Sequence, residues 1–168
     1  YWHKLMAGRD IRTTIVKGML KALERCDFFD YDHARRLQSF VGIIGDRLQL
    51  RKSQRKNLHL LAQFQDIGKI GMSDEILYKP APLTAEEFNE ISRHCEIGYR
   101  IARSIPELTG IADWVLKHHE FWDGSGYPLG LKGEAIPLES RILAVADAYE
   151  VMTAARPYRQ ALTKREAV

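Results

Sequence analysis

Apolar residues recur every three or four positions along most of the chain, and this periodicity limits its choice of folds more than any other feature. One stripe consists of Ile11, Ile15, Met19 and Leu23, and the next of Leu37, Phe40, Val41 and Ile44. Such spacing places the apolar side chains on one face of an α-helix. Alternating apolar and polar runs long enough for strands are missing from the sequence. The pattern therefore predicts an all-α fold, a bundle of helices packed through these stripes.

Six helices are predicted, over residues 9–25, 30–50, 53–65, 84–104, 111–120 and 138–155, with a further one starting near Thr163. Thr84, followed three residues later by Glu87, forms a capping-box pattern at the start of the fourth helix. Two segments rich in glycine and proline, 68–82 and 122–137, are predicted loops. The second lies between the fifth and sixth helices and is long for a compact domain, which is typical of a functional loop.

Composition narrows the class of partner. The net charge is +3, from 25 basic and 22 acidic residues, which is too small to predict DNA binding and fits a modest anionic ligand better. The two cysteines, Cys26 and Cys95, form no CxxC pair, so we expect a reducing compartment, the cytoplasm. No apolar run approaches the roughly 20 residues of a membrane span, so we expect no membrane contact within this segment.

The 168 residues suffice for one domain with a buried core. Both ends of the chain fall inside helical patterns. We therefore expect a single domain, 1–168, that belongs to a longer protein and is truncated in its last helices.

Polar residues interrupt the apolar stripes on five of the predicted helices. They are His33, Gln65 with Asp66, His94, His118 with His119, and Asp147. Each continues the apolar face of its helix and is predicted to point inward. One such histidine alone is more simply explained as a hydrogen-bonded core residue, but the coincidence over five helices favours convergence on metal ions. His3 and His59 lack this support and are expected to be structural or surface residues.

Two motifs resemble those of the HD-GYP family, within the HD superfamily of metal-dependent phosphohydrolases. Residues 65–71, QDIGKIG, resemble the HDIGKIG signature, and residues 118–128, HHEFWDGSGYP, resemble HHE-x-WDGSGYP. Further agreement lies in 131–137, 141–147 and 156–159. The resemblance covers most of the chain and implies an HD-type helical bundle with a long GYP loop between the fifth and sixth helices. It also implies hydrolysis of the bacterial second messenger cyclic di-GMP.

The resemblance further implies two metal sites that share Asp66. The first would use His33, Gln65, Asp66 and Asp147, and the second Asp66, His94, His118 and His119. Asp66 and Lys69 are the implied catalytic residues, with Lys69 beside a metal-activated water and the scissile phosphate. The implied dinucleotide-binding residues are Lys69, Tyr127, Pro128, Arg156 and Arg159. The less favoured alternative for the two arginines is a surface pair at a helix end, and the alternative for Tyr127 with Pro128 is a plain turn.

Gln65 replaces the histidine of the HD signature. A glutamine oxygen is a weaker ligand than imidazole for transition metals, so we expect the first site to be weakened and one or two divalent ions to bind per chain. Iron or manganese is expected, with zinc or nickel as alternatives. Phe29 stands where some relatives place a glutamate for a third metal, and Glu150 stands where aspartate is usual.

Two functions remain open at this stage. One is a cyclic di-GMP phosphodiesterase that tolerates Gln65. The other is a catalytically degenerate domain that binds cyclic di-GMP or a partner protein in signalling without hydrolysis. A phosphohydrolase for another nucleotide is a third hypothesis, by analogy alone. Expected partners are an attached sensory or regulatory domain or a signalling protein. A homodimer through the first helix is an alternative to internal packing of its apolar stripe.

Overall fold

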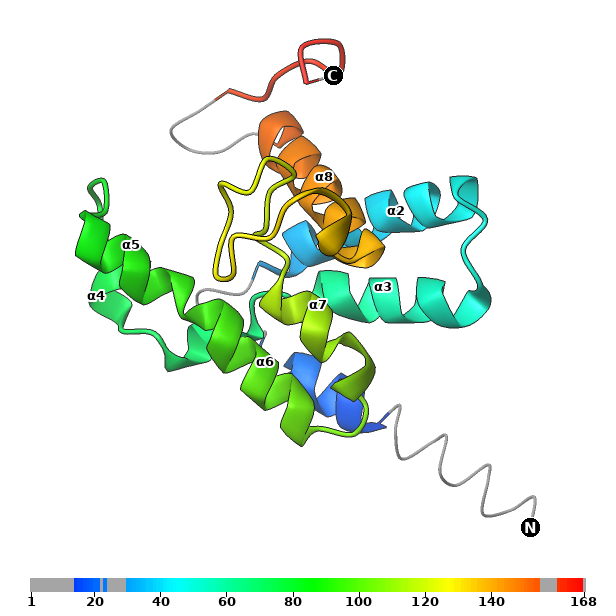
Figure 1. The fold of residues 1–168 in the computed structure, drawn as a ribbon, viewed down its shortest axis with the longest axis horizontal. Helices are drawn as coiled ribbons and strands as arrows, with labels where there is room; N and C mark the ends of the chain where they lie inside the picture. The colour runs from blue at the N-terminus through cyan, green and yellow to red at the C-terminus, as the bar shows by residue number, and fades with distance from the viewer. Residues whose placement is uncertain (1–13, 22, 24–29, 155–159, 168) are drawn as a thin grey trace.

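The computed structural model describes residues 14–21, 23, 30–154 and 160–167, and every regular element in these residues is helical (Figure 1). Residues 14–21 and 23 belong to the predicted first helix. The longer helices that follow are α2 (Tyr31–Arg47), α3 (Lys52–Phe64), α6 (His94–Ser104) and α8 (Leu138–Thr153). The shorter ones are α4 (Asp74–Leu77), α5 (Ala85–Ser92) and α7 (Ala112–Leu116), with 3-10 turns η1 (Ile67–Gly71), η2 (Thr109–Ile111) and η3 (Gly133–Ala135). The predicted all-α fold is confirmed.

The core lies where α2 packs against α3 and α8, and where α6 packs against α7 and η1. Fully buried side chains from these helices fill it, among them Leu37, Val41, Leu58, Leu61, Val115 and Leu143. In the first helix Leu23 is buried and Met19 packs against the core, whereas Ile15 is exposed and Ile11 lies outside the described residues. At Met19 and Leu23 this stripe therefore packs internally. Among the described residues, no helix combines the length and apolar character that crossing a bilayer needs.

The predicted fourth helix, 84–104, is wrong as a single element, because the chain breaks at Arg93 into α5 and α6. The Ser92 hydroxyl donates to the carbonyl of Phe88 at 2.7 Å, and this kind of side-chain bond competes with the helical ladder and bends helices. The predicted capping box at Thr84 is confirmed, since its hydroxyl accepts from the Glu87 amide. The break makes His94 the first residue of α6.

The predicted fifth helix, 111–120, is also too long, because α7 ends at Leu116 and residues 117–119 form a turn. The ring of His118 bonds to the carbonyl of Val115, which a continuing helix would need for the amide of His119. His118 and His119 therefore lie in a turn and not on a helical face, and the interpretation that treated them as helical neighbours is wrong.

The remaining differences concern loops. The predicted loop 68–82 includes most of η1 and the whole of α4, and the predicted loop 122–137 contains η3. The helix predicted from Thr163 is a turn in the described residues, closed by a bond between the amide of Glu166 and the Thr163 hydroxyl. The predicted second helix ends three residues early, at Arg47, and its predicted start is confirmed by Asp30, which accepts from the His33 amide.

Candidate metal centre

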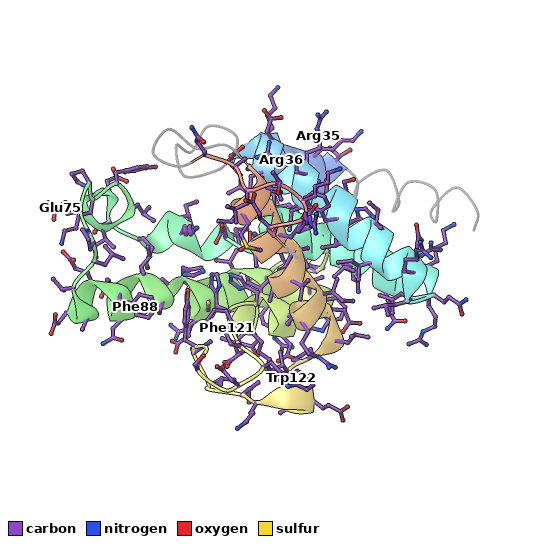
Figure 2. The ribbon with its side chains drawn as sticks, turned by 90° about the horizontal axis from the view of Figure 1, so that it is seen from above. Arg35, Arg36, Glu75, Phe88, Phe121 and Trp122 are labelled. Carbon is purple, nitrogen blue, oxygen red and sulfur yellow. The ribbon has the colours of Figure 1, made fainter. Side chains whose placement is uncertain are left out.

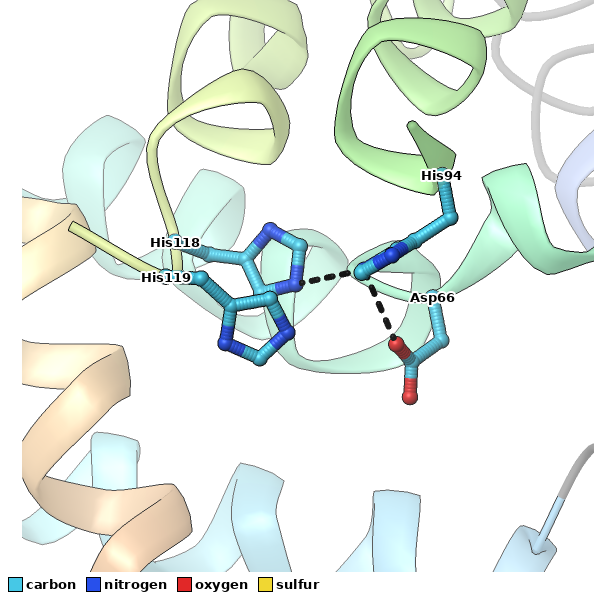
Figure 3. A group of neighbouring side chains, drawn as sticks. All are labelled: Asp66, His94, His118 and His119. Carbon is cyan, nitrogen blue, oxygen red and sulfur yellow. Dashed lines mark hydrogen bonds and ion pairs between the residues drawn. The ribbon is translucent and has the colours of Figure 1, made fainter. Parts of the chain in front are cut away.

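Four of the predicted ligands come together at one point in the fold (Figure 3). Asp66 follows α3, His94 begins α6, and His118 and His119 lie in the turn after α7; one ligand atom from each lies within 4.8 Å of the others. His94 Nε2 is 3.4 Å from His118 Nε2 and 3.7 Å from Asp66 Oδ1. Ligands about 2.0–2.2 Å from a shared cation lie roughly 3–3.6 Å apart. The spacing of the two Nε2 atoms lies in this range and the spacing to Asp66 lies just above it, so small side-chain movements would let the cluster bind a divalent metal ion.

Backbone carbonyls orient two of the histidines. His94 Nδ1 lies 2.6 Å from the carbonyl oxygen of Ile91, and His118 Nδ1 lies 2.7 Å from that of Val115. A carbonyl can only accept, so each Nδ1 carries the proton and each Nε2 turns its lone pair toward the cluster. This arrangement of the second ring nitrogen is typical of metal-binding histidines.

The charge states of the cluster also suit a cation. Burial, reinforced by His94 and Lys69, lowers the pKa of His118 to about 4, and the pKa of His94 is lowered mainly by burial as well. Burial acts to raise the pKa of Asp66, but the charges of Lys69 and His118 outweigh it and hold that pKa well below its usual value. Near neutral pH the cluster offers a carboxylate and uncharged imidazoles, which are the forms that bind metal.

Lys69 lies beside this cluster. Its Nζ is 2.9 Å from Asp66 Oδ2, while Oδ1 of the same carboxylate faces His94. Both side chains are partly exposed, about a quarter each. The ammonium therefore lies at the open side of the cluster, where a bound anion can reach it.

A glycine permits this close approach of η1 to α6. A Cβ on Gly68 would lie 1.9 Å from the carbonyl oxygen of His94 and 2.6 Å from the amide of Gly98. Both obstacles are backbone atoms, which cannot rotate away as a side chain can. Gly68 thus brings Asp66 and Lys69 to the start of α6.

Two of the predicted first-site residues, His33 and Asp147, lie together in a second group with Glu150. His33 Nε2 lies 3.3 Å from Asp147 Oδ1, and His33 Nδ1 lies 2.7 Å from Glu150 Oε2. Hydrogen bonding to Asp147 is the main cause that raises the pKa of His33. Gln65 is buried at the end of α3, next to Asp66 in the chain. The structure therefore pairs His33 with Asp147, whereas no hydrogen bond joins Gln65 to either of them within the described residues.

The GYP loop returns to the histidine turn. The Tyr127 ring lies 4.9 Å from the ring of His119, and the Tyr127 amide donates to the His119 carbonyl at 3.0 Å. A Cβ on Gly126 would lie 2.3 Å from the Phe121 amide nitrogen, so the approach requires glycine. Phe88, labelled on α5 in Figure 2, also packs against Tyr127, ring edge to face, with the ring centroids 5.5 Å apart. Tyr127 thus adjoins the cluster, and Pro128 follows it through a cis peptide bond.

Sequence reasoning missed three residues of this region. Glu120 is 2% exposed, and its two oxygens accept the amides of Leu129 and Leu131, each at 2.7 Å. Cys95 is buried with Sγ 3.6 Å from His94 Nε2, and burial raises its pKa to about 12, so its thiol is protonated. Glu150 is the third; the sequence singled it out only as a position where aspartate is usual, without a role. Glu120 left a signal as a carboxylate inside the GYP motif. Arg156 and Arg159, predicted to bind the dinucleotide, lie outside the described residues.

The comparisons with known proteins agree with this fold. The HD domain family matches residues 19–168, nearly all of the chain. The chain is 40% identical over 150 residues to the cyclic di-GMP phosphodiesterase response regulator RpfG of Xanthomonas campestris, covering 86% of this chain and 39% of that protein. It is 41% identical over 143 residues to a cyclic di-GMP phosphodiesterase of Thermotoga maritima, covering 84% and 39%. The chain belongs to the HD superfamily and, with these relatives, to its HD-GYP family.

Two further relatives come from Vibrio cholerae. The chain is 36% identical over 153 residues to a protein named 3'3'-cGAMP-specific phosphodiesterase 1, covering 91% of this chain and 36% of that one. A crystal structure of a cyclic GMP-AMP specific phosphodiesterase matches with a TM-score of 0.57 at 24% identity, over 71% of this chain and 35% of the other, and supports the fold alone. The chain spans about two fifths of the length of the curated relatives that it matches.

Proposed function

We propose that this chain is a metal-dependent phosphodiesterase domain that hydrolyses a cyclic dinucleotide, with cyclic di-GMP as the substrate. The observation that carries the proposal is the cluster of Asp66, His94, His118 and His119 with the Lys69 ammonium at its open side. A cation and a lysine together suit a phosphate group. The relatives named above at 40 and 41% identity are named for cyclic di-GMP, which supports this choice of substrate.

The cluster at Asp66 supports one ligand set, and the contact of His33 with Asp147, together with the HD-GYP motifs, supports the other. Asp66, His94, His118 and His119 would hold one divalent ion, and His33, Gln65, Asp66 and Asp147 a second, weaker one. A metal pair supplies Lewis acidity, which makes water a better nucleophile near neutral pH and stabilises charge on the phosphate oxygens. Imidazole and carboxylate ligands favour iron or manganese in this proposal, with zinc or nickel as alternatives.

The chain's own residues bind and orient the substrate. Lys69 donates to a phosphate oxygen from its place beside Asp66. Burial, together with Cys95 and Asp66, raises the pKa of Tyr127, so its hydroxyl keeps its proton and can donate to the dinucleotide. Pro128 is proposed to contact the dinucleotide next to Tyr127, and Arg156 and Arg159 are proposed to bind its phosphates.

Hydrolysis is tested by incubating the purified chain with cyclic di-GMP in manganese or iron and following the linear and mononucleotide products. We expect turnover by the wild type. The variant His118→Ala should lose bound metal, at least a hundredfold of the rate and some thermal stability, because the ion stabilises the fold by mass action. Lys69→Met should keep the metal and lose rate. His59→Ala, on the exposed side of α3, is the matched control.

Each contrary outcome has a defined meaning. Tight binding of cyclic di-GMP without turnover in any metal would favour the degenerate, ligand-binding alternative that Gln65 raises. Turnover of 3'3'-cGAMP but not of cyclic di-GMP would contradict the proposed substrate and keep the reaction. Unchanged metal content in His118→Ala would contradict the site itself.

A further inference from the structure

Glu150 on α8 bonds to two side chains of α2, His33 and Arg36, across the contact between these helices. Its Oε2 lies 2.7 Å from His33 Nδ1, and its Oε1 lies 2.6 Å from Arg36 Nε. The carboxylate is 1% exposed, whereas the Arg36 side chain is 44% exposed and reaches it from the surface of α2 (Figure 2). A buried carboxylate is costly unless its oxygens are paired, and here both are.

The chemistry of the partners requires a carboxylate. Arg36 can only donate, so it occupies one oxygen and leaves the other for His33. A carboxylate beside Nδ1 holds the proton on that nitrogen and leaves the lone pair on Nε2. That Nε2 faces Asp147 at 3.3 Å.

The two metal-binding regions therefore orient their histidines by different means. His94 and His118 are held by backbone carbonyls, which no substitution removes. His33 depends on the side chain of a residue 117 positions away. A substitution of Glu150 on α8 can therefore change the orientation of His33. His33 belongs to the proposed first metal site, where Gln65 stands in place of a stronger ligand.

We propose that Glu150 is the positioning residue of the first metal site, holding His33 so that Nε2 and Asp147 together bind the ion despite Gln65. This inference rests on the proposed metal pair. Removal of a hydrogen-bond partner of a metal-binding histidine typically weakens metal binding about 10–100-fold. We expect a loss of that size for the first ion when Glu150 loses its carboxylate, with the second ion unaffected.

The experiment compares Glu150→Gln with Glu150→Asp by metal content per chain and by the Kd of each manganese ion. Glutamine keeps the size of the side chain but has one acceptor oxygen for two donors, whereas aspartate is shorter and keeps both oxygens. A positioning role predicts that aspartate preserves first-site affinity better than glutamine. A role in packing alone predicts the reverse order, which would overturn the inference. Glu139→Gln is the matched control, a buried carboxylate on the same helix that accepts from Gln54.

Two further variants keep the outcomes distinct. If His33→Ala loses one of two ions while Glu150→Gln keeps both, the inference about Glu150 is wrong and the metal pair stands. If the wild type binds one ion and His33→Ala keeps it, the first site and the inference both fail. Should Glu150→Gln not fold, the double variant Arg36→Met/Glu150→Gln frees the glutamine oxygen for His33. That variant should bind the first ion within about tenfold of wild type, and loss of the ion would overturn the inference.

Discussion

The Nε2 atoms of His94 and His118 lie 3.4 Å apart, although 24 positions separate the two residues in the chain. Backbone carbonyls hold a proton on each Nδ1, so two lone pairs face each other at this distance. Burial lowers the pKa of both rings, which disfavours a proton between them. The pair is therefore arranged to share a cation, and four predictions follow from this geometry and its surroundings.

Gln65→His should raise the metal content per chain toward two. Imidazole binds transition metals more strongly than an amide oxygen, and position 65 directly precedes Asp66. Elemental analysis after dialysis measures the change. Gln63→His, two residues earlier on α3, is the control and should leave metal content unchanged; an equal metal content in Gln65→His and wild type would contradict our view of the first site.

Gly68→Ala should destabilise the fold by about 1–3 kcal/mol or more and reduce metal binding. The added methyl group meets the His94 carbonyl oxygen at 1.9 Å, so η1 must move away from α6 and take Asp66 with it. Urea unfolding and metal content report the two effects. Gly45→Ala, whose new Cβ meets its nearest atom at 3.5 Å, should fold at least as stably as wild type. Normal metal content in a well-folded Gly68→Ala variant would contradict the claim that the close approach of η1 to α6 at Gly68 positions Asp66.

Glu120→Gln should loosen the GYP loop. One of the two backbone amides, of Leu129 or Leu131, then faces an NH₂ group, and an unsatisfied buried donor costs about 1–3 kcal/mol. We expect a higher KM for the dinucleotide with metal content unchanged, because the loop adjoins the cluster through Tyr127. Steady-state kinetics and metal analysis test this, with the exposed Glu134→Gln in η3 as control. A change in metal content with normal KM would contradict it.

The metal-free chain should lose stability as the pH falls from about 6.5 toward 4. The pKa of His118 is about 4 in the folded chain, against 6.5 as its ordinary value. The unfolded chain therefore binds more protons in this window, which favours unfolding. At about 1.4 kcal/mol per pH unit, His118 alone contributes a loss of about 2 kcal/mol between pH 6.5 and 5.

His33 has the opposite sign, since its raised pKa adds stability at low pH that is lost as the pH rises. His119, with a pKa lowered mainly by burial to about 2, acts in the same direction as His118. Urea midpoints at pH 7.5 and 5 measure the balance. His118→Gln should make the folding stability depend less on pH, and His59→Gln should not change that dependence. Greater stability at pH 5 than at pH 7.5 would contradict the prediction.

The fold class and the residues that could serve as ligands could be predicted because both depend on local patterns. Apolar stripes predicted α2, α3 and α8 within a few residues of their ends. Polar interruptions of the predicted helical stripes marked Asp66, His94, His118 and His119. Helix ends at Arg93 and Leu116 could not be predicted, because side-chain bonds to backbone carbonyls decide them. Propensity and periodicity do not report such bonds.

The sequence by itself determined the helical class, the family motifs and the identity of the residues available as ligands, because residue type and spacing along a helix are local properties. Tertiary structure alone decided which of them meet. Glu150 bonds to His33 across 117 positions, and Gly68 admits the carbonyl of His94 at a distance that no other residue allows. Such contacts depend on how distant segments pack, and close packing leaves no room for the alternatives that the sequence pattern would also permit.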